Sequence, residues 1–276
     1  MEMRFQVGGS PRFRLEFGGN PRFRLEFGGE MPQPEPPGPA IDWDETKIGV
    51  MALTEDKEPT DEIEYFMTWN EVVAYIGNLE EMYPKLWIHQ GILMDPIPLL
   101  GDSQFAGIPF TYIDIYHQPE IPDYCFDGYY GYYFDRITGL EGVTRFGDRA
   151  FGDQHYLEQF DIPSTVRELG YSALSGLTFT SIVIPEGVTE IADELFYLDP
   201  YLTSVTLPST ITTIGARAFW RCYALPSITI PSSVTSIEEE AFIECNSLTS
   251  IIVNKPAGSI SGAPWGAEHA TVTWGG

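Results

Sequence analysis

The sequence predicts a repeat solenoid that is mainly β with short turns and helical segments. Residues 202–253 repeat with a period of 23, as LTSVTLPSTITTIGARAFWRCYA, then LPSITIPSSVTSIEEEAFIECNS, then LTSIIV. Apolar residues recur at fixed positions of each row, so no row can bury its apolar side without a neighbouring row. Upstream of the rows we expect an α/β capping region, preceded by an N-terminal arm of repeated β-strands.

The charge of the chain is large and unevenly placed. The 276 residues carry a net charge of −25, whereas residues 1–29 contain five arginines and three glutamates, a net +2, so the remainder carries −27. An acidic body argues against nucleic acid or an anionic membrane as a partner. No apolar run approaches the length of about 20 residues that spans a bilayer, so we expect no membrane insertion. The start, MEMRFQVGG, lacks the features of a signal peptide, and we expect no export signal.

Residues 1–29 form the predicted arm. SPRFRLEFGG at 10–19 is followed by NPRFRLEFGG at 20–29, and within each copy apolar and charged residues alternate as in a half-buried strand. A sheet of this size is only marginally stable alone in water. Its apolar side must therefore be covered by the rest of the chain, by another protein or by sister copies. The proline-rich linker 30–40 favours the last two, because it acts as a semi-rigid spacer. The predicted docking residues are Arg12, Phe13, Arg14, Leu15, Phe17, Arg22, Phe23, Arg24, Leu25 and Phe27.

Residues 41–109 form the predicted capping region. We expect a strand at 47–53, an acidic loop at 54–64 and a helix over 69–83 with one apolar face. Residues 86–109 then form a degenerate first coil. This region would cover the open end of the solenoid, since terminal repeats need a cap.

Residues 110–253 divide into six rows, 110–133, 134–156, 157–178, 179–201, 202–224 and 225–247, with a seventh begun at 248. Each row begins with a short strand, in which positions 4 and 6 point inward and positions 3 and 5 outward. A proline at position 7 ends this strand, because it cannot donate to a ladder. Positions 10 and 13 form a second inward pair, and a small residue and an aromatic residue at 17 and 18 enter the core. Residues 254–276 would cap the last coil with a tryptophan plug and a final strand.

The shared core of these rows, L-xx-I-x-I-P-xx-V-T-x-I-xxx-A-F-xx-C, resembles the BspA-type leucine-rich repeat. The resemblance covers about residues 110–253. It implies a right-handed solenoid that serves as an adhesion or protein-binding surface, and it implies no catalytic residues.

Two sets of outward residues are candidates for ligand contact. Positions 3 and 5 of the later rows are mostly small and uncharged, which favours a plain solvated face over a ligand surface. The earlier rows carry a cluster rich in tyrosine, a residue favoured at interfaces, which could instead fill irregular parts of the core. Its members are Tyr112, Asp114, Tyr116, Tyr129, Tyr130 and Tyr132.

The residue patterns of known catalytic and cofactor sites are absent from the sequence. The four histidines are scattered, and the three cysteines lack the spacing of a metal site. There is no nucleophile elbow, phosphate-binding glycine loop or dinucleotide fingerprint. We therefore predict a protein that is not an enzyme and that binds neither a cofactor nor a metal.

Three hypotheses for function follow. In the first, the protein is a bacteriophage virion component, in which residues 1–29 dock on a capsid or tail protein and the solenoid is displayed in several copies or as a homo-oligomer. In the second, it is a bacterial surface adhesin that binds a host surface protein or glycan. In the third, it is an intracellular protein-binding scaffold in the cytoplasm.

Overall fold

The computed structural model describes residues 48–53, 59–66, 71–72, 75, 86–90, 111–115, 118–130 and 133–275. The chain divides into two compact units, 1–40 and 41–276. The predictions for the arm and for the proline-rich linker lie outside the described residues.

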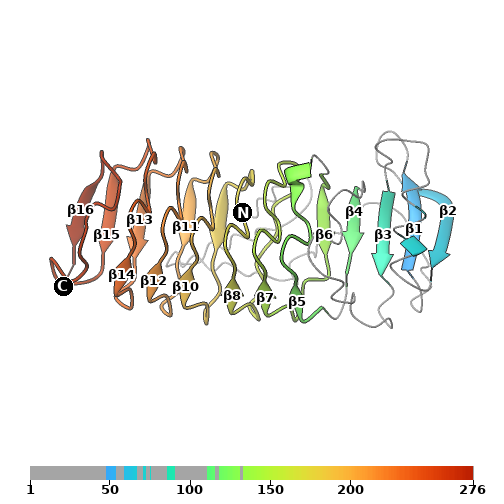
Figure 1. Cartoon of the computed structure of the whole chain (residues 1–276), viewed down its shortest axis with the longest axis horizontal. Coiled ribbons are helices and arrows are strands. Elements are labelled where there is room, and N and C mark those ends of the chain that lie inside the picture. The colour runs from blue at the N-terminus through green and yellow to red at the C-terminus, as the bar shows by residue number, and fades with distance from the viewer. Residues whose placement is uncertain are drawn as a thin grey trace, which may run out of the picture. The chain divides into compact units, whose positions relative to one another are not determined.

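The coils build two parallel ladders, which confirms the predicted solenoid (Figure 1). The first ladder contains β4 (Tyr112–Asp114), β6 (Arg136–Thr138), β9 (Ser181–Val183), β11 (Ser204–Thr206), β13 (Ser227–Ile230), β15 (Ser250–Val253) and β16 (Thr271–Trp274). The second contains β5 (Glu120–Ile121), β7 (Arg145–Phe146), β8 (Glu168–Leu169), β10 (Glu190–Ile191), β12 (Thr213–Ile214) and β14 (Ser236–Ile237). A short 3-10 helix, η1 (Gly128–Tyr130), follows β5. Within each ladder equivalent positions of successive coils pair in register, as in Ser227 with Ser250 and Ser250 with Thr271.

The first ladder is interrupted where a row departs from the consensus. The N–H of Thr203 donates to Thr180 O, and that of Thr249 to Pro226 O. The backbone N–H at position 2 of one coil therefore forms a hydrogen bond with the backbone carbonyl at position 2 of the coil before it. Pro226 occupies position 2 of its own coil and has no N–H to donate, and the pairing between β11 and β13 is broken there. In the coil of residues 157–178, the Gln159 side chain donates to Ser181 O at 2.9 Å in place of a strand.

The core is a stack of aromatic side chains from position 18. The rings of Phe196, Phe219 and Phe242 lie parallel at 5.2 Å from one coil to the next, and all three are buried. Beyond the last coil, Trp265 is 3% exposed and its ring lies 6.5 Å from Phe242. The Trp274 ring of β16 lies 6.3 Å from Trp265. Tryptophans therefore continue the stack and cover its C-terminal end.

Aspartates directly after the second ladder bind the backbone of the following coil. Asp148 N donates to Asp123 Oδ1 at 2.9 Å, Tyr171 N to Asp148 Oδ1 at 2.9 Å and Ala216 N to Asp193 Oδ1 at 2.7 Å. In the next coil a glycine packs against each aspartate, namely Gly147 against Asp123, Gly170 against Asp148 and Gly215 against Asp193. A Cβ atom on any of these glycines would overlap the aspartate.

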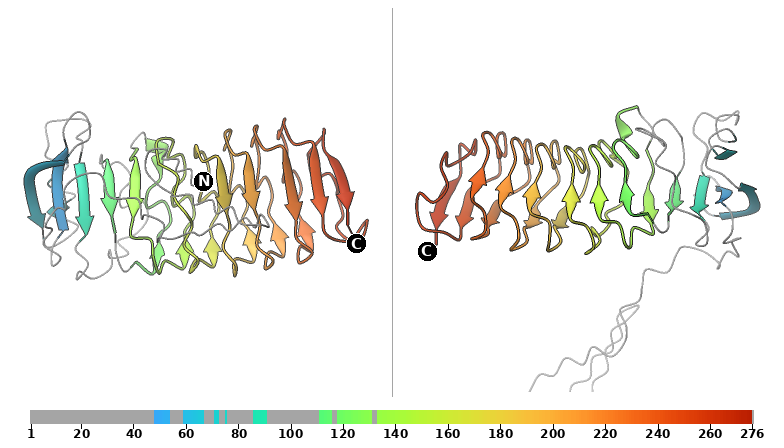
Figure 2. Two further views of the ribbon diagram at one scale, coloured as in Figure 1. Left: turned by 180° about the vertical axis from the view of Figure 1, so that it is seen from behind. Right: turned by 60° about the horizontal axis from the view of Figure 1, so that its bottom comes forward.

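At the other end, β1 (Ile48–Leu53) pairs antiparallel with both β2 (Pro59–Phe66) and β3 (Leu86–Gln90). β3 pairs in parallel with β4, so these strands extend the first ladder (Figure 2). The predicted acidic loop over 54–64 is wrong for residues 59–64, which belong to β2. Of the helix predicted over 69–83, the described residues 71, 72 and 75 are helical, and Val72 is buried as expected.

Candidate functional site

The outward side chains of the last five strands of the first ladder, β9, β11, β13, β15 and β16, form an exposed surface, here called the strand face. It consists of Ser181, Val183, Ser204, Thr206, Ser227, Thr229, Ser250, Ile252, Thr271 and Thr273. The inward neighbours Ile228 and Ile251 are buried, so alternation along each strand sets this face apart from the core. Because the strands pair in register, the same position repeats from coil to coil about every 4.8 Å.

Exposed tyrosines lie in the segments that lead into the first-ladder side of three coils. Tyr156 and Tyr201 end their rows and are 66% and 59% exposed, and Tyr223 is 37% exposed. Tyr201 precedes the first residue of β11 by three positions. The sequence analysis did not single out these tyrosines, although their position in the last two residues of their rows was a visible signal.

The predicted tyrosine cluster is placed on two different parts of the coil. Tyr112 and Asp114 lie on β4, where Arg136 lies 4.5 Å over the Tyr112 ring and Thr138 Oγ1 donates to Asp114. Asp114 is only 6% exposed, so it is less accessible than we predicted. Tyr129 lies on η1, after the second ladder, and is 73% exposed.

The side chains of the remaining predicted site residues lie outside the described part of the chain. Tyr130 belongs to η1, but its side chain is not described, and Tyr116 and Tyr132 lie outside the described residues. All ten predicted docking residues of the arm also lie outside them.

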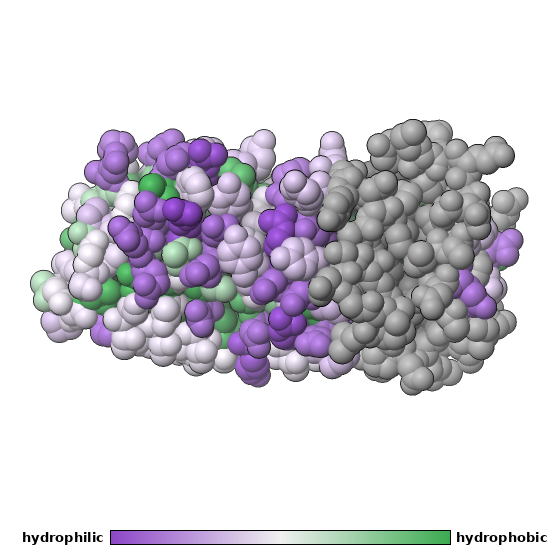
Figure 3. Space-filling view, viewed as in Figure 1, coloured by the Kyte–Doolittle hydropathy of each residue, from purple (hydrophilic) through white to green (hydrophobic). Residues whose placement is uncertain are grey.

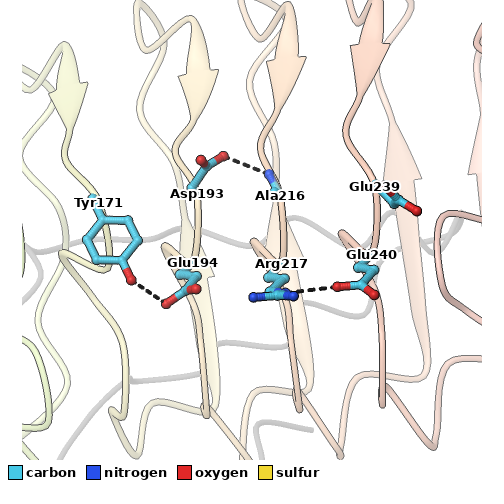
Figure 4. A pocket seen from close by; sticks show the side chains of 7 residues that line it. All are labelled: Tyr171, Asp193, Glu194, Ala216, Arg217, Glu239 and Glu240. Atoms are coloured by element: carbon cyan, nitrogen blue, oxygen red, sulfur yellow. Dashed lines mark hydrogen bonds and ion pairs between the residues drawn. The ribbon is translucent and has the colours of Figure 1, made fainter.

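A hollow of about 400 Å³ lies on the return segments between coils (Figure 4). It is lined by Tyr171, Asp193, Glu194, Ala216, Arg217, Glu239 and Glu240. The hydroxyl of Tyr171 donates to Glu194 at 2.6 Å, which raises the pKa of Tyr171, and Arg217 pairs with Glu240 at 2.9 Å. Most of these polar groups therefore bind one another from coil to coil, an arrangement that holds coils together.

Arg149 connects polar groups of two successive coils near the N-terminal end of the solenoid. It donates to Asp127 at 2.9 Å and to Asp153 at 2.6 Å, and hydrogen bonding to Asp127 raises the pKa of Arg149. Asp127 is 4% exposed, so its charge depends on this partner. In the described part of the chain no group of three or more His, Cys, Asp or Glu side chains is placed to hold a metal ion.

Position 21 carries a buried side chain that can form hydrogen bonds in four coils, namely Gln154, Asp199, Cys222 and Cys245. The thiols of Cys222 and Cys245 donate to Phe196 O and Phe219 O, at 3.2 and 2.9 Å. Burial raises the pKa of Cys245 to about 12, so its thiol is neutral and unreactive. These cysteines therefore act as small core residues.

Asp199 occupies the same position in its coil and is 3% exposed. Its Oδ1 accepts a hydrogen bond from Leu177 N at 2.7 Å. Burial raises the pKa of Asp199 well above its ordinary value of 3.8, and the charge of Asp153 acts in the same direction. A carboxyl therefore stands where the following coil has the neutral thiol of Cys222 and the preceding coil has Leu177.

The repeats decide the family. A sequence model described as the BspA type leucine rich repeat region matches in six copies, over residues 93–178 and 119–249. The chain belongs to the BspA-type leucine-rich repeat family. A search of curated proteins found no match. Among the described residues of this BspA-type protein, no helix has both the length and the apolar character needed to cross a membrane.

Solved structures with a similar fold come from several bacteria. A leucine rich cell surface protein from Faecalibacterium prausnitzii is 26% identical with a TM-score of 0.47, and the match covers 63% of this chain and 54% of that chain. The T. pallidum leucine rich repeat protein is 26% identical with a TM-score of 0.40, over 51% and 62% of the two chains. A leucine-rich repeat protein from Bacteroides ovatus is 18% identical with a TM-score of 0.41, over 72% and 68%. This BspA-type chain thus spans about half the length of the Faecalibacterium protein, and its family membership rests on the repeats.

Proposed function

We propose that this protein is a non-catalytic binding scaffold of the bacterial surface-adhesin type, and that its ligand binds on the strand face. The observation that carries the proposal is the strand face itself, a regular and exposed surface on a rigid stack of coils. Binding sites that lie on rigid elements are held precisely, because neighbouring coils fix each side chain. The polar groups of the return segments are largely occupied by one another, which leaves the strand face as the more available surface.

An adhesion assay tests this proposal without knowledge of the ligand. Beads coated with the purified protein would be applied to surfaces of mucin, denatured collagen and a neutral plant polysaccharide. The variant Thr206→Lys/Thr229→Lys places two charges on the strand face, at exposed positions that tolerate lysine without a change in the core. The control Glu239→Gln changes an exposed residue of the hollow on the return segments.

We expect adhesion to at least one surface, with a loss of at least tenfold in the lysine variant and little change in the control. Equal adhesion of the wild type and the lysine variant to every surface would refute a ligand site on the strand face. Surface display would be tested by protease accessibility on intact cells, where protection of the full-length protein would contradict it.

The virion hypothesis stays a prediction, since the residues on which it depends lie outside the described part of the chain. Deletion of residues 1–29 tests it directly. The hypothesis expects loss of incorporation into virus particles, and it fails if the truncated protein is still incorporated.

A further inference from the structure

The strand face from β9 to β16 is free of charge on a strongly acidic protein. Its ten outward positions, two on each of five strands, are Ser, Thr, Val or Ile, although the chain carries a net charge of −25. The same positions of the N-terminal coils include Asp114, Arg136 and Asp161. The neutral surface therefore begins at β9 and continues to the last strand.

The tyrosines at the end of this surface add a second feature. Tyr201 is 59% exposed and Tyr223 37% exposed, and they belong to successive coils. Large aromatic rings of this kind are more commonly packed against other groups, because each can bury 150 Å² or more. Their exposed rings, three and four residues before the first residues of β11 and β13, provide flat apolar area near the start of these strands.

The composition of the face does not favour a protein partner. Serine is depleted at protein interfaces, and serine, threonine and valine are under-represented among the residues that dominate their binding energy. The exposed apolar residues Val183 and Ile252 belong to strands that do not pair with each other. In the view of Figure 3, hydrophobic surface of the described residues is confined to small patches between hydrophilic side chains. A large apolar interface with a second copy therefore lacks its usual core.

A neutral sugar polymer fits the same features. Serine and threonine hydroxyls both donate and accept hydrogen bonds, as sugar hydroxyls do, so the two can pair in either direction. Within the paired strands β9 and β11, and again within β13, β15 and β16, the hydroxyls of the first outward position repeat about every 4.8 Å, close to the length of one pyranose unit in an extended glycan. The C–H face of a pyranose ring can stack on an exposed tyrosine, and an uncharged glycan meets no repulsion on an uncharged surface.

We propose that the strand face from β9 to β16 binds an uncharged polysaccharide that runs along the ladder, with Tyr201 and Tyr223 stacking against its sugar rings. The proposal rests on the proposed function, because it names the ligand class of the same face.

Affinity electrophoresis in native gels tests the proposal, since a protein of net charge −25 migrates readily. The gels would contain glucomannan, xyloglucan, mixed-linkage β-glucan or galactomannan, and a gel with polygalacturonate would serve as the charged comparison. Tyr201→Ala/Tyr223→Ala removes the stacking rings, and Thr206→Lys/Thr229→Lys adds charge to the face. Tyr129→Ala is the matched control, because Tyr129 is an exposed tyrosine on η1, away from these strands.

We expect at least one neutral polymer to retard the wild type, with binding at least tenfold weaker in both strand-face variants and within twofold of wild type for Tyr129→Ala. Unchanged circular dichroism and melting temperature would show that the variants are folded. Retardation by none of the neutral polymers, or equal weakening by Tyr129→Ala, would overturn the proposal. If adhesion to mucin or collagen still depends on Thr206 and Thr229 in that case, the proposed function stands and only the glycan is wrong. If adhesion is independent of the strand face as well, both fail.

Discussion

Substitution of Gly215 by alanine should destabilise the protein through a clash with the preceding coil. A Cβ atom at this position would lie 2.4 Å from Asp193 Oδ1 and 2.7 Å from Asp193 N. The second contact is with the backbone, so rotation of the Asp193 side chain alone cannot relieve the overlap. Alanine for glycine at a permissive backbone position would stabilise by about 0.4–1 kcal/mol through the unfolded chain. Overpacking costs about 1–3 kcal/mol, so the clash decides the sign.

The expected net loss is roughly 1–2 kcal/mol, or a fall of about 2–8 °C in melting temperature for a folded body of this size. Thermal and urea unfolding followed by circular dichroism would measure it. Ala192→Gly is the matched comparison, because Ala192 occupies the position of Gly215 one coil earlier. The residue in the coil before Ala192 that corresponds to Asp193 is Tyr171, so no aspartate packs against this position. This variant should lose only about 0.5–1 kcal/mol. A second variant, Asp193→Ala, removes the hydrogen bond to Ala216 N and should cost about 0.5–1.5 kcal/mol.

Combination of Asp193→Ala with Gly215→Ala should cost less than the sum of the two single changes, because the shorter side chain makes room for the new methyl group. A Gly215→Ala protein as stable as the wild type would refute the steric argument. Additive costs in the double variant would show that the overlap lies with the backbone alone.

Three further predictions concern buried polar groups. Because the pKa of Asp199 is higher in the folded state than in the unfolded chain, its ionisation opposes folding as pH rises above about 4. Asp199→Asn should therefore raise the melting temperature at pH 7 and flatten the fall in stability from pH 4 upward. Identical pH profiles of the variant and the wild type would contradict this. The buried thiols, with the pKa of Cys245 raised to about 12, should not react with a thiol reagent in the native protein, and all three cysteines should react after unfolding in urea. Arg149→Met should lower the free energy of unfolding by roughly 1–3 kcal/mol in denaturant titrations, because the buried carboxylate of Asp127 then keeps only the hydrogen bond from Tyr129 N. The loss of stability should be smaller in Arg149→Met/Asp127→Asn, in which the buried charge is removed as well.

The coils could be predicted from the sequence because each structural role repeats at a fixed position. Inward isoleucines and valines, the proline after the first strand and the aromatic at position 18 all occur where the period of 23 places them. The second ladder was anticipated only as an inward pair at positions 10 and 13. Its strands are two residues long, as in Thr213–Ile214, which is too short for periodicity along the chain to reveal.

The N-terminal end was harder to predict because its strands depend on distant partners. The segment PTDEIEYF of β2 contains three acidic residues, a composition typical of a loop. Its strand conformation comes from pairing with β1, which lies between β2 and β3. Such pairing depends on the fold as a whole, whereas a local pattern reports only the preference of the segment itself.

The candidate site was only partly predictable. The uncharged outward positions of the later rows were visible in the sequence, but composition alone could not distinguish a ligand surface from a solvated one. The predicted tyrosine cluster stays a prediction, with Asp114 hydrogen-bonded to Thr138 on the first ladder and Tyr129 on a different part of the coil. The exposure of Tyr201 was not predicted, because it depends on the path of the chain from the return segment into β11.

The aspartate and glycine pairs show how the coils keep their order while the strand face stays uniform. Each aspartate after the second ladder is followed, one coil later, by a glycine that makes room for it. Where the first residue of such a pair is Tyr171 or Ala216, the residue one coil later is Ala192 or Glu238, and no glycine is present. A coil stacked out of order would place an aspartate against a side chain with no space for it. The strand face offers no such discrimination, because its serines and threonines are nearly interchangeable between coils. The order of the coils is therefore specified on the return side, which leaves the outward residues of the first ladder free to be selected for a repetitive ligand.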